Sequence, residues 1–490
     1  MGEKQHLTLV QSFFRYLIAS KIIYVFPGVA WIFLNIFFLP FQVGTEAMHR
    51  PWLILNGEVP YRDFEWIRNP LDLFLVAGVF KLFGIHAFVL RVFSLIMYLV
   101  ISLTIFFGLR KESLKLAVTA FYVYIILLFP LFMNTQIGEA LVSLFILLSV
   151  LSFWQFGKRK SAKSLFLSGV FSGAALVTKQ TSIGIIGAII VALAVFYLKK
   201  GILKKAFVYF FGVFSSYSFL ILYLIFNNAL DDYFYYAIYF NLFIYREAAG
   251  KWGFNEGMRM LSLYASVVIP FALVKITQIP KQIKFLIVIS IIGMIPTLLP
   301  SFWSYRLNTA LPLVSIAAAC VLLALSEKTN IQRKNISSAI LIVGVFGFIG
   351  FYGYFLKQYE SFIKNYGISL LPYIYEDSPN DITAAEWLSK NTSEDVKIFN
   401  TASNTIMRLS NRKHHNKYID GLPWVYHPYD ETFADITKDP PRVVVWDKNL
   451  PTNWPEMKDW KFIPYLHKNY TVQKGFDGIE IYFLNELSSH

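Results

Sequence analysis

Long uninterrupted apolar runs are the feature that most constrains this chain of 490 residues. Hydrophobic residues make up 56% of it, and only 16% of its residues are charged. Soluble globular proteins average about 25% charged residues. They also arrange their apolar residues in periodic stripes and not in long runs. Because a run of about 20 apolar residues can cross the hydrocarbon core of a bilayer as a helix, the chain is predicted to be an α-helical polytopic membrane protein.

About eleven transmembrane helices are predicted. The runs lie at approximately residues 22–40, 88–108, 115–133, 138–156, 164–180, 182–198, 204–226, 260–276, 283–299, 308–326 and 338–356. A further run at 71–84 reaches only roughly 21 Å at 1.5 Å per residue. If this run crossed the membrane, every later loop would change sides and the basic connectors would lie outside, against the positive-inside rule. The run is therefore predicted to be an interfacial or re-entrant helix on the outer side.

Lysine and arginine collect in alternate connectors of this scheme. The basic connectors lie at 110–115, 158–163, 199–205, 275–284 and 328–334. By the positive-inside rule they are cytoplasmic, together with the N-terminus. The outer side then carries the first loop (41–87), a large loop (227–259) and everything after about residue 357.

The C-terminal residues have a different composition. Residues 376–490 hold 13 Lys and Arg against 17 Asp and Glu, whereas the whole chain has a formal net charge of +14. Helical patterns near 381–390, 403–410 and 459–467 alternate with strand-like runs at Val396–Phe399, Arg442–Trp446 and Gly478–Leu484. We therefore predict a transmembrane domain over 1–375 and a soluble extracytoplasmic α/β domain over 376–490.

Charge and cysteine content exclude several other classes. The excess positive charge belongs to the membrane part and forms no basic patch on a soluble face, so no nucleic-acid partner is predicted. The single cysteine, Cys320, excludes a disulfide framework and a zinc site of CxxC type. His414 and His415 have no ligand partner at metal spacing, so no metal is assigned.

Acidic residues of the membrane part are scarce, and most fall on the predicted outer side. A carboxylate there can take a proton from an acceptor hydroxyl or amine. Arginine can hold and neutralise a phosphate. The candidate catalytic residues are Glu46, Asp63 and Glu139. The candidate cations at the level of a lipid phosphate are Arg50, Arg62, Arg68, Lys179 and Arg306.

Each candidate also has a purely structural interpretation. Glu46 would be a solvated loop carboxylate, Asp63 would form an ion pair that fixes the loop, and Glu139 would interact with a helix dipole. Three other acidic residues of the loop and the histidine beside Arg50 are not assigned to the site, although this histidine is close enough in sequence to Arg50 to assist it. The acids Glu58, Glu65 and Asp72 are expected to be solvated, and His49 to be polar filling.

An ordered set of motifs over residues 40–312 resembles the GT-C superfamily of polytopic glycosyltransferases, which includes protein O-mannosyltransferases and the lipid A aminoarabinose transferase. Each motif lies on the predicted outer side or at the outer end of a span. They are an acid after the first span, Asn56-Gly-x-x-Pro-Tyr-Arg-Asp-Phe64, the segment ending Lys81-Leu-Phe-Gly84 with Arg91 beyond it, Gly138-Glu139-Ala140, Thr178-Lys179-Gln180-Thr181 and Tyr305-Arg306-Leu-Asn-Thr-Ala-Leu-Pro312.

The resemblance implies transfer of a sugar from a polyprenyl-phosphate donor to a glycan, lipid or protein acceptor at the outer face, with inversion at the anomeric carbon. It also implies that an acid of the first outer loop is the base, and that the next outer turn often supplies a second acid. Glu46 and Glu139 match those places. The family often has Asp-Glu where this chain has Thr45-Glu46, so the base stays open between Glu46 and Asp63.

Two other classes of function are compatible with a chain of many apolar spans. A transporter or flippase of a lipid-linked substrate would also need many spans, but it would be expected to show repeat symmetry and charges near the midplane of the membrane. A structural scaffold that displays the C-terminal domain would not need an acid-rich first loop. Under the leading hypothesis, the C-terminal domain is expected to cap the active site and help to select the acceptor.

Overall fold

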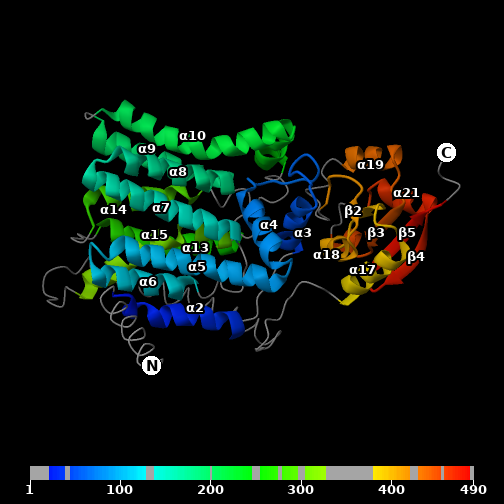
Figure 1. The fold of residues 1–490 in the computed structure, drawn as a ribbon, viewed down its shortest axis with the longest axis horizontal. Coiled ribbons are helices and arrows are strands. Elements are labelled where there is room, and N and C mark those ends of the chain that lie inside the picture. Colours follow the sequence, from blue (N-terminus) through cyan, green and yellow to red (C-terminus); the bar gives the residue numbers. More distant parts are fainter. Residues whose placement is uncertain are drawn as a thin grey trace, which may run out of the picture.

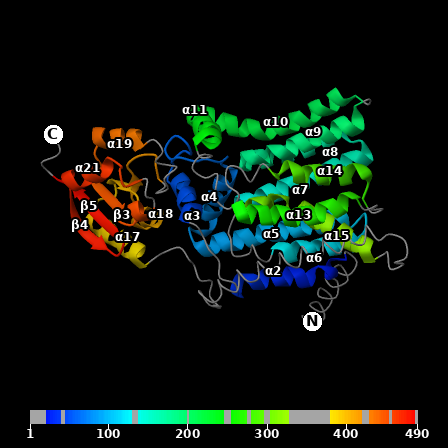
Figure 2. The ribbon, with the colours of Figure 1, turned by 180° about the vertical axis from the view of Figure 1, so that it is seen from behind.

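The computed structural model describes residues 21–38, 45–128, 137–198, 201–244, 254–273, 279–295, 304–326, 379–419, 429–453 and 457–485. Within these ranges the chain forms two parts, a bundle of long helices and a smaller sheet with helices packed on it (Figure 1). Helices α3 (Thr45–Leu55) and α4 (Leu71–Phe83) lie between them. Figure 2 shows the same order of parts from behind.

Four of the described helices are long and apolar enough to cross a membrane. They are α5 (Ala87–Leu109), α7 (Ile137–Arg159), α9 (Ile183–Tyr197) with the turn η3 (Gln180–Ser182) before it, and α10 (Ile202–Phe226). Shorter helices complete the bundle. These are η1 (Ile22–Tyr24), α2 (Phe26–Phe38), α6 (Leu114–Leu128), α8 (Ala162–Thr178), α13 (Phe254–Leu273), α14 (Lys281–Gly293), η6 (Ser304–Ala310) and α15 (Leu311–Ser326).

The predicted apolar runs coincide with these helices wherever the chain is described. The run at 338–356 lies outside the described residues, so the number of crossings stays a prediction. The segment at 71–84 forms α4, whose 13 residues span only about 20 Å and cannot cross a bilayer. The large loop predicted at 227–259 contains α11 (Leu230–Tyr233) and a π-helix, η4 (Phe234–Ile244).

Small residues bring α8 and α10 into backbone contact. A Cβ atom added to Gly169 would lie 2.1 Å from the Tyr209 carbonyl oxygen, and one on Gly212 would lie 2.2 Å from the Phe166 carbonyl oxygen. Only glycine fits at such an approach, as in the small-residue packing of membrane helices. Tyr209 also donates a hydrogen bond to Ser172 Oγ (2.8 Å), which satisfies both hydroxyl groups inside the bundle.

The described residues of 379–485, which we call the α/β segment, form a five-stranded sheet with strand order β2-β1-β3-β5-β4. Strand β1 (Lys397–Asn400) pairs in parallel with β2 (Lys413–His414) and β3 (Val443–Asp447), whereas β5 (Ile479–Leu484) is antiparallel to β3 and β4 (Tyr470–Phe476). The helices are α17 (Pro379–Asn391), α18 (Asn404–Ser410), α19 (Tyr429–Lys438), α20 (Leu450–Asn453) and α21 (Phe462–Asn469).

The central strands of this sheet are buried on both faces. Val443 and Val445 belong to the apolar cluster that contains Leu388 of α17 and Ile406 of α18. The alternate residues Val444 and Trp446 belong to the cluster of α19 and α21 on the opposite face. The α/β segment therefore has apolar cores of its own. The predicted boundary at residues 375 and 376 lies outside the described residues and stays a prediction.

The α/β segment is attached to the bundle through the loop that follows α3. The backbone N–H of Glu65 donates to the Lys417 carbonyl oxygen (2.9 Å), and the N–H of Ile419 donates to both Glu65 carboxylate oxygens (2.9 and 2.8 Å). Lys417 also pairs with Asp232 at 3.2 Å. The expectation that Glu65 is solvated was wrong, because residues 417–419 cover it and leave 2% of it exposed.

Candidate active site

Charged side chains of both signs meet at the end of the bundle that faces the α/β segment. We call Glu46, Arg50, Arg68, Asp72, Glu139, Lys179 and Arg306 the charged cluster. Its most buried contact joins Lys179 Nζ to Glu139 Oε1 at 2.6 Å, with side-chain exposures of 7% and 2%. Glu139 lies in the first turn of α7, and Lys179 is the extended residue between α8 and η3. Two distant turns of the chain therefore share one buried ion pair.

Helix α3 supplies the most exposed carboxylate of the cluster. Glu46 and Arg50 lie four residues apart on one face of the helix and form a 2.8 Å ion pair. The Arg50 side chain is 5% exposed and stacks over the Trp66 ring at 4.5 Å, whereas 45% of the Glu46 side chain is exposed. Desolvation alone would raise the pKa of Glu46, but the charges of Arg50 and Arg68 outweigh it and keep that pKa below its usual value. Glu46 is therefore held in the ionised form, with nearly half of its side chain exposed.

Arg68 interacts electrostatically both with the carboxylate on α3 and with the charged residues at the starts of α4 and α7. Its charge acts on Glu46, Asp72, Glu139 and Lys179. The backbone carbonyl of Arg68 accepts a 2.5 Å hydrogen bond from the Tyr61 hydroxyl, which fixes the turn that presents this side chain. Arg68 thus lies among three carboxylates.

Asp72 belongs to the cluster although the sequence analysis expected it to be solvated. It lies in the first turn of α4 and is only 9% exposed. Burial raises the pKa of Asp72 to about 6, an effect that the nearby Arg68 opposes and Glu139 reinforces. A Cβ atom on Gly138 would lie 2.7 Å from Asp72 Oδ2, so the glycine before Glu139 makes room for this carboxylate.

Arg306 completes the cluster from η6, the turn that precedes α15. It is 6% exposed, and its charge acts on Lys179. Ser143 of α7 donates to the Asn308 carbonyl oxygen at 2.8 Å, which ties this turn to the helix that carries Glu139.

Hydrogen bonds to backbone oxygens hold the loop that carries Arg68. Gln180 donates to the carbonyl oxygens of Ile67 (2.8 Å) and Ala237 (3.1 Å), and Asn241 of the π-helix donates to Ile67 at 2.6 Å. Tyr233 donates to the Asn69 side chain at 3.1 Å. The loop between α3 and α4 is thus fixed between the end of α8 and the helices at 230–244.

Arg62 and Asp63 lie outside the charged cluster. The Arg62 guanidinium makes a two-pronged contact with the Asp63 carboxylate (2.8 and 2.7 Å) and also donates to the Asn227 carbonyl oxygen. Desolvation would raise the pKa of Asp63, but the hydrogen bonds from Arg62 and from the Val59 N–H hold it below its usual value. This geometry matches the structural interpretation, an ion pair that fixes the loop.

His49 and His414 form a contact that no sequence pattern predicts. The two Nε2 atoms lie 2.7 Å apart, both side chains are buried, and His49 stacks on Trp52. Burial lowers the pKa of His414 to about 3 and that of His49 well below its usual value. The two rings are therefore neutral, one donating to the other, and join α3 to strand β2. Among the described residues no three His, Cys, Asp or Glu side chains are grouped to hold a metal.

Comparison with known proteins places this geometry in context. A family model described as dolichyl-phosphate-mannose-protein mannosyltransferase matches residues 68–226, a stretch that contains Arg68, Asp72, Glu139 and Lys179. The structure of ArnT from Cupriavidus metallidurans bound to undecaprenyl phosphate aligns with a TM-score of 0.56 over 96% of this chain and 99% of that chain, at 10% sequence identity. The chain has the GT-C fold.

Two other solved structures of this fold also align with the chain. ArnT in the apo state aligns with a TM-score of 0.55 at 11% identity, over 96% of this chain and 99% of that chain. An oligosaccharyltransferase from Archaeoglobus fulgidus tethered with an acceptor peptide aligns with a TM-score of 0.51 at 13% identity, over 90% of this chain and 70% of that chain. No curated protein matches the sequence. The GT-C fold expected from the motifs is thus confirmed, and the roles of single residues stay predictions.

Proposed function

We propose that this protein is an inverting glycosyltransferase that moves a sugar from a polyprenyl-phosphate donor to an acceptor at the outer face of the membrane. The observation that carries the proposal is the charged cluster at one end of a GT-C bundle, in which the half-exposed Glu46 carboxylate pairs with the buried Arg50 and lies near the charge of Arg68. Two proteins of this fold support the donor class, because ArnT is seen with undecaprenyl phosphate and the archaeal oligosaccharyltransferase AglB with a dolichol-phosphate.

Glu46 is the proposed catalytic base. A general base must be ionised and within reach of the proton that it removes. The lowered pKa of Glu46 and its half-exposed side chain support this role. Asp63 is also ionised, but Arg62 and the Val59 N–H already occupy its oxygens.

The cations of the cluster are proposed to hold the phosphate. Glu46, Asp72 and Glu139 contribute three formal negative charges, whereas Arg50, Arg68, Lys179 and Arg306 contribute four positive charges. The excess of one positive charge suits a polyprenyl-phosphate sugar, whose phosphodiester carries one negative charge. Buried, fixed cations stabilise the second negative charge that develops as the phosphate leaves.

In the proposed reaction, Glu46 takes the proton of an acceptor hydroxyl or amine. The freed oxygen or nitrogen bonds to the anomeric carbon of the sugar. The bond between that carbon and the phosphate oxygen breaks, and its electron pair leaves with the polyprenyl phosphate. A single displacement with one carboxylate base inverts the anomeric carbon, by analogy with inverting glycoside hydrolysis.

The orientation of the chain is part of the proposal. The described lysines and arginines of the predicted cytoplasmic connectors lie at the ends of α5 and α7 and at the starts of α6, α8, α10 and α14, away from the α/β segment. This arrangement supports an N-terminus in the cytoplasm and an α/β segment outside. Since the α/β segment contacts the loop that carries the cluster, it is proposed to cap the site and to contribute to the choice of acceptor.

The test is an assay of the purified full-length protein with radiolabelled polyprenyl-phosphate sugars and extracted envelope acceptors. The wild type is compared with Glu46→Gln, Asp63→Asn and a matched control, Glu386→Gln, which removes an exposed carboxylate on α17. Transfer should be lost only with Glu46→Gln. If the wild type transfers no sugar from any donor but moves lipid-linked sugar across vesicle membranes, the protein is a flippase and the proposal is wrong.

A further inference from the structure

A second site lies at the other end of the bundle. A cavity of about 740 Å³ opens between α5, α7 and α8. It is far from the charged cluster, because Glu139 and Arg159 stand at opposite ends of α7, about 30 Å apart at 1.5 Å per residue. Its volume falls within the range of roughly 300–1,000 Å³ that is typical of small-molecule sites.

One wall of the cavity is apolar and continues onto the surface of the bundle. Val100, Leu103 and Phe107 of α5 form one side, and Leu148 and Leu151 of α7 form another. Val100 and Phe107 are 39% and 38% exposed, so this wall reaches the surface that faces lipid in a membrane. The cavity is therefore open to an acyl chain.

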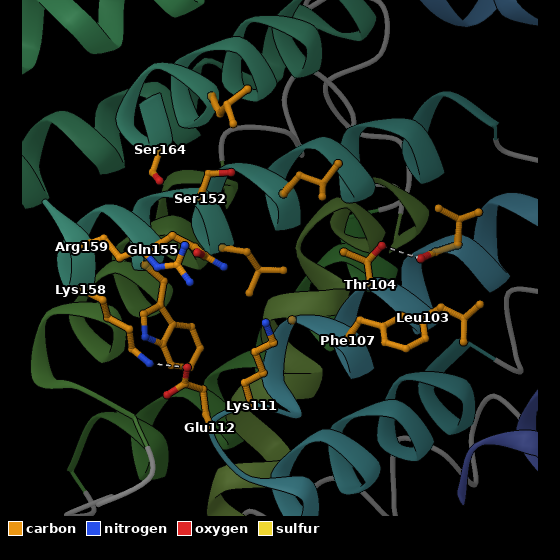
Figure 3. Close-up of a pocket in the computed structure, with 16 residues that line it drawn as sticks. Leu103, Thr104, Phe107, Lys111, Glu112, Ser152, Gln155, Lys158, Arg159 and Ser164 are labelled. Atoms are coloured by element: carbon orange, nitrogen blue, oxygen red, sulfur yellow. Dashed lines mark hydrogen bonds and ion pairs between the residues drawn. The ribbon is translucent and has the colours of Figure 1, made fainter. Parts of the chain in front are cut away.

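The opposite part of the cavity is cationic. Lys111, Lys158 and Arg159 line it together with a single acid, Glu112. Lys158 pairs with Glu112, whereas Lys111 and Arg159 form no hydrogen bond or ion pair within the described part of the chain. Figure 3 shows Lys111 extending toward the middle of the cavity, with Arg159 beside Gln155.

We propose that this cavity binds an anionic phospholipid from the leaflet that borders this end of the bundle. The two cations that are not ion-paired attract the negatively charged phosphate of such a lipid. The hydroxyl and amide groups of Ser152, Gln155 and Ser164 are placed to bond to the rest of a headgroup, and the apolar wall accommodates a chain. A free phosphate would use the cations but not the apolar wall, so an amphipathic anion fits the whole site better.

The test uses the full-length protein in nanodiscs of phosphatidylcholine with a minor fraction of phosphatidylglycerol, followed by native mass spectrometry of retained lipid. The variant Lys111→Gln with Arg159→Gln removes both cations from the cavity. The control, Lys163→Gln with Lys204→Gln, removes two exposed lysines from the same end of the bundle outside the cavity. The first pair should weaken phosphatidylglycerol retention on the order of twentyfold, and the control less than twofold. Equal loss in both, or no loss in either, would overturn the proposal.

Two further measurements separate a lipid site from a general anion site. Millimolar inorganic phosphate should not displace the retained phosphatidylglycerol, and displacement would show that the site binds phosphate without a chain. Ser152→Phe places a bulky ring in the cavity without changing its charge, so it should reduce retention while the protein stays monodisperse. Retention equal to that of the wild type in Ser152→Phe would contradict the proposed position.

Discussion

The two ends of the helical bundle use the same kinds of charged residue in opposite ways. At the end that faces the α/β segment, Lys179 and Glu139 are almost completely buried and lie beside Arg68. At the other end, the pair of Lys158 and Glu112 is 41% and 25% exposed. Burying charges costs stability unless each has a partner. Among the described residues, this buried ion pair lies at the end of the bundle where the proposed reaction needs fixed charges.

The largest expected effect is the difference in stability between breaking the buried Lys179–Glu139 pair and breaking the exposed Lys158–Glu112 pair. Lys179→Met leaves Glu139 buried without its partner and should lower the free energy of unfolding by about 3–5 kcal/mol. Lys158→Met should lower it by about 0–1 kcal/mol, because water screens that pair. Thermal unfolding in detergent measures both, and Lys179→Met combined with Glu139→Leu should recover much of the loss. Equal destabilisation by the two single variants would remove the distinction between the ends.

Arg68 and Arg62 lie in the same loop, but only Arg68 belongs to the charged cluster, so their substitutions should affect the reaction differently. Arg68→Gln should lower the rate of sugar transfer about a hundredfold, since fixed charges near a leaving group contribute on that order. Arg62→Gln should change the rate by only a few fold, because Arg62 pairs with Asp63 outside the cluster. Initial rates at saturating donor decide between them. A greater loss of transfer rate with Arg62→Gln than with Arg68→Gln would indicate that the reaction takes place beside Asp63 and not at the charged cluster.

The pair of His49 and His414 should make the attachment of the α/β segment sensitive to acid. Both pKa values are lowered in the folded protein, to about 3 for His414, so this contact is fully stable above about pH 6.5 and weakens as the pH falls toward 3. Arg50 and Arg408 add to the cost of a positive charge on His49. Limited proteolysis between pH 7 and pH 5 should release the segment faster at the lower pH. His414→Gln should flatten this dependence, and an unchanged pH profile in that variant would rule the pair out as its cause.

Glu58 should cause the smallest pH-dependent change in stability. Its contribution falls as the pH rises, whereas that of the pair of His49 and His414 falls as the pH drops. Burial raises its pKa to about 7, and Asp63 adds to the shift while Lys413 and Lys397 of the α/β segment oppose it. The contribution of Glu58 to stability is therefore complete below about pH 4.5 and is lost as the pH rises through about 7. Because Glu58 is partly exposed, the change should stay below about 1 kcal/mol. Glu58→Gln should remove it in a comparison of thermal unfolding at pH 5 and pH 8.

The sequence predicted the helices because the length of an apolar run depends on local residues and on the thickness of a membrane. It also identified Glu46, Arg50 and Arg68 as candidates, because charged residues at the edge of an apolar bundle are scarce. It could not place Asp72, whose burial depends on Gly138, a residue 66 positions away. Nor could local pattern reveal the contact between His49 and His414, which are 365 residues apart.

The strands of the α/β segment could likewise be predicted only where the local sequence has a clear apolar pattern. Strands β1, β3 and β5 lie within or close to the predicted runs because they are rich in apolar residues. Strand β4 was missed, since it lies at the edge of the sheet and most of its residues are exposed, which leaves no alternating pattern. Strand β2 has only two residues, too few for any pattern.

The most direct test of the account is the turnover of a polyprenyl-phosphate sugar by Glu46→Gln at saturating donor and acceptor. The account predicts that the rate falls by about 10²–10⁴-fold, as expected for loss of a general base. Binding of polyprenyl phosphate should stay within a few fold of the wild type, because the buried cations remain. Turnover by Glu46→Gln at the rate of the wild type would contradict the central claim.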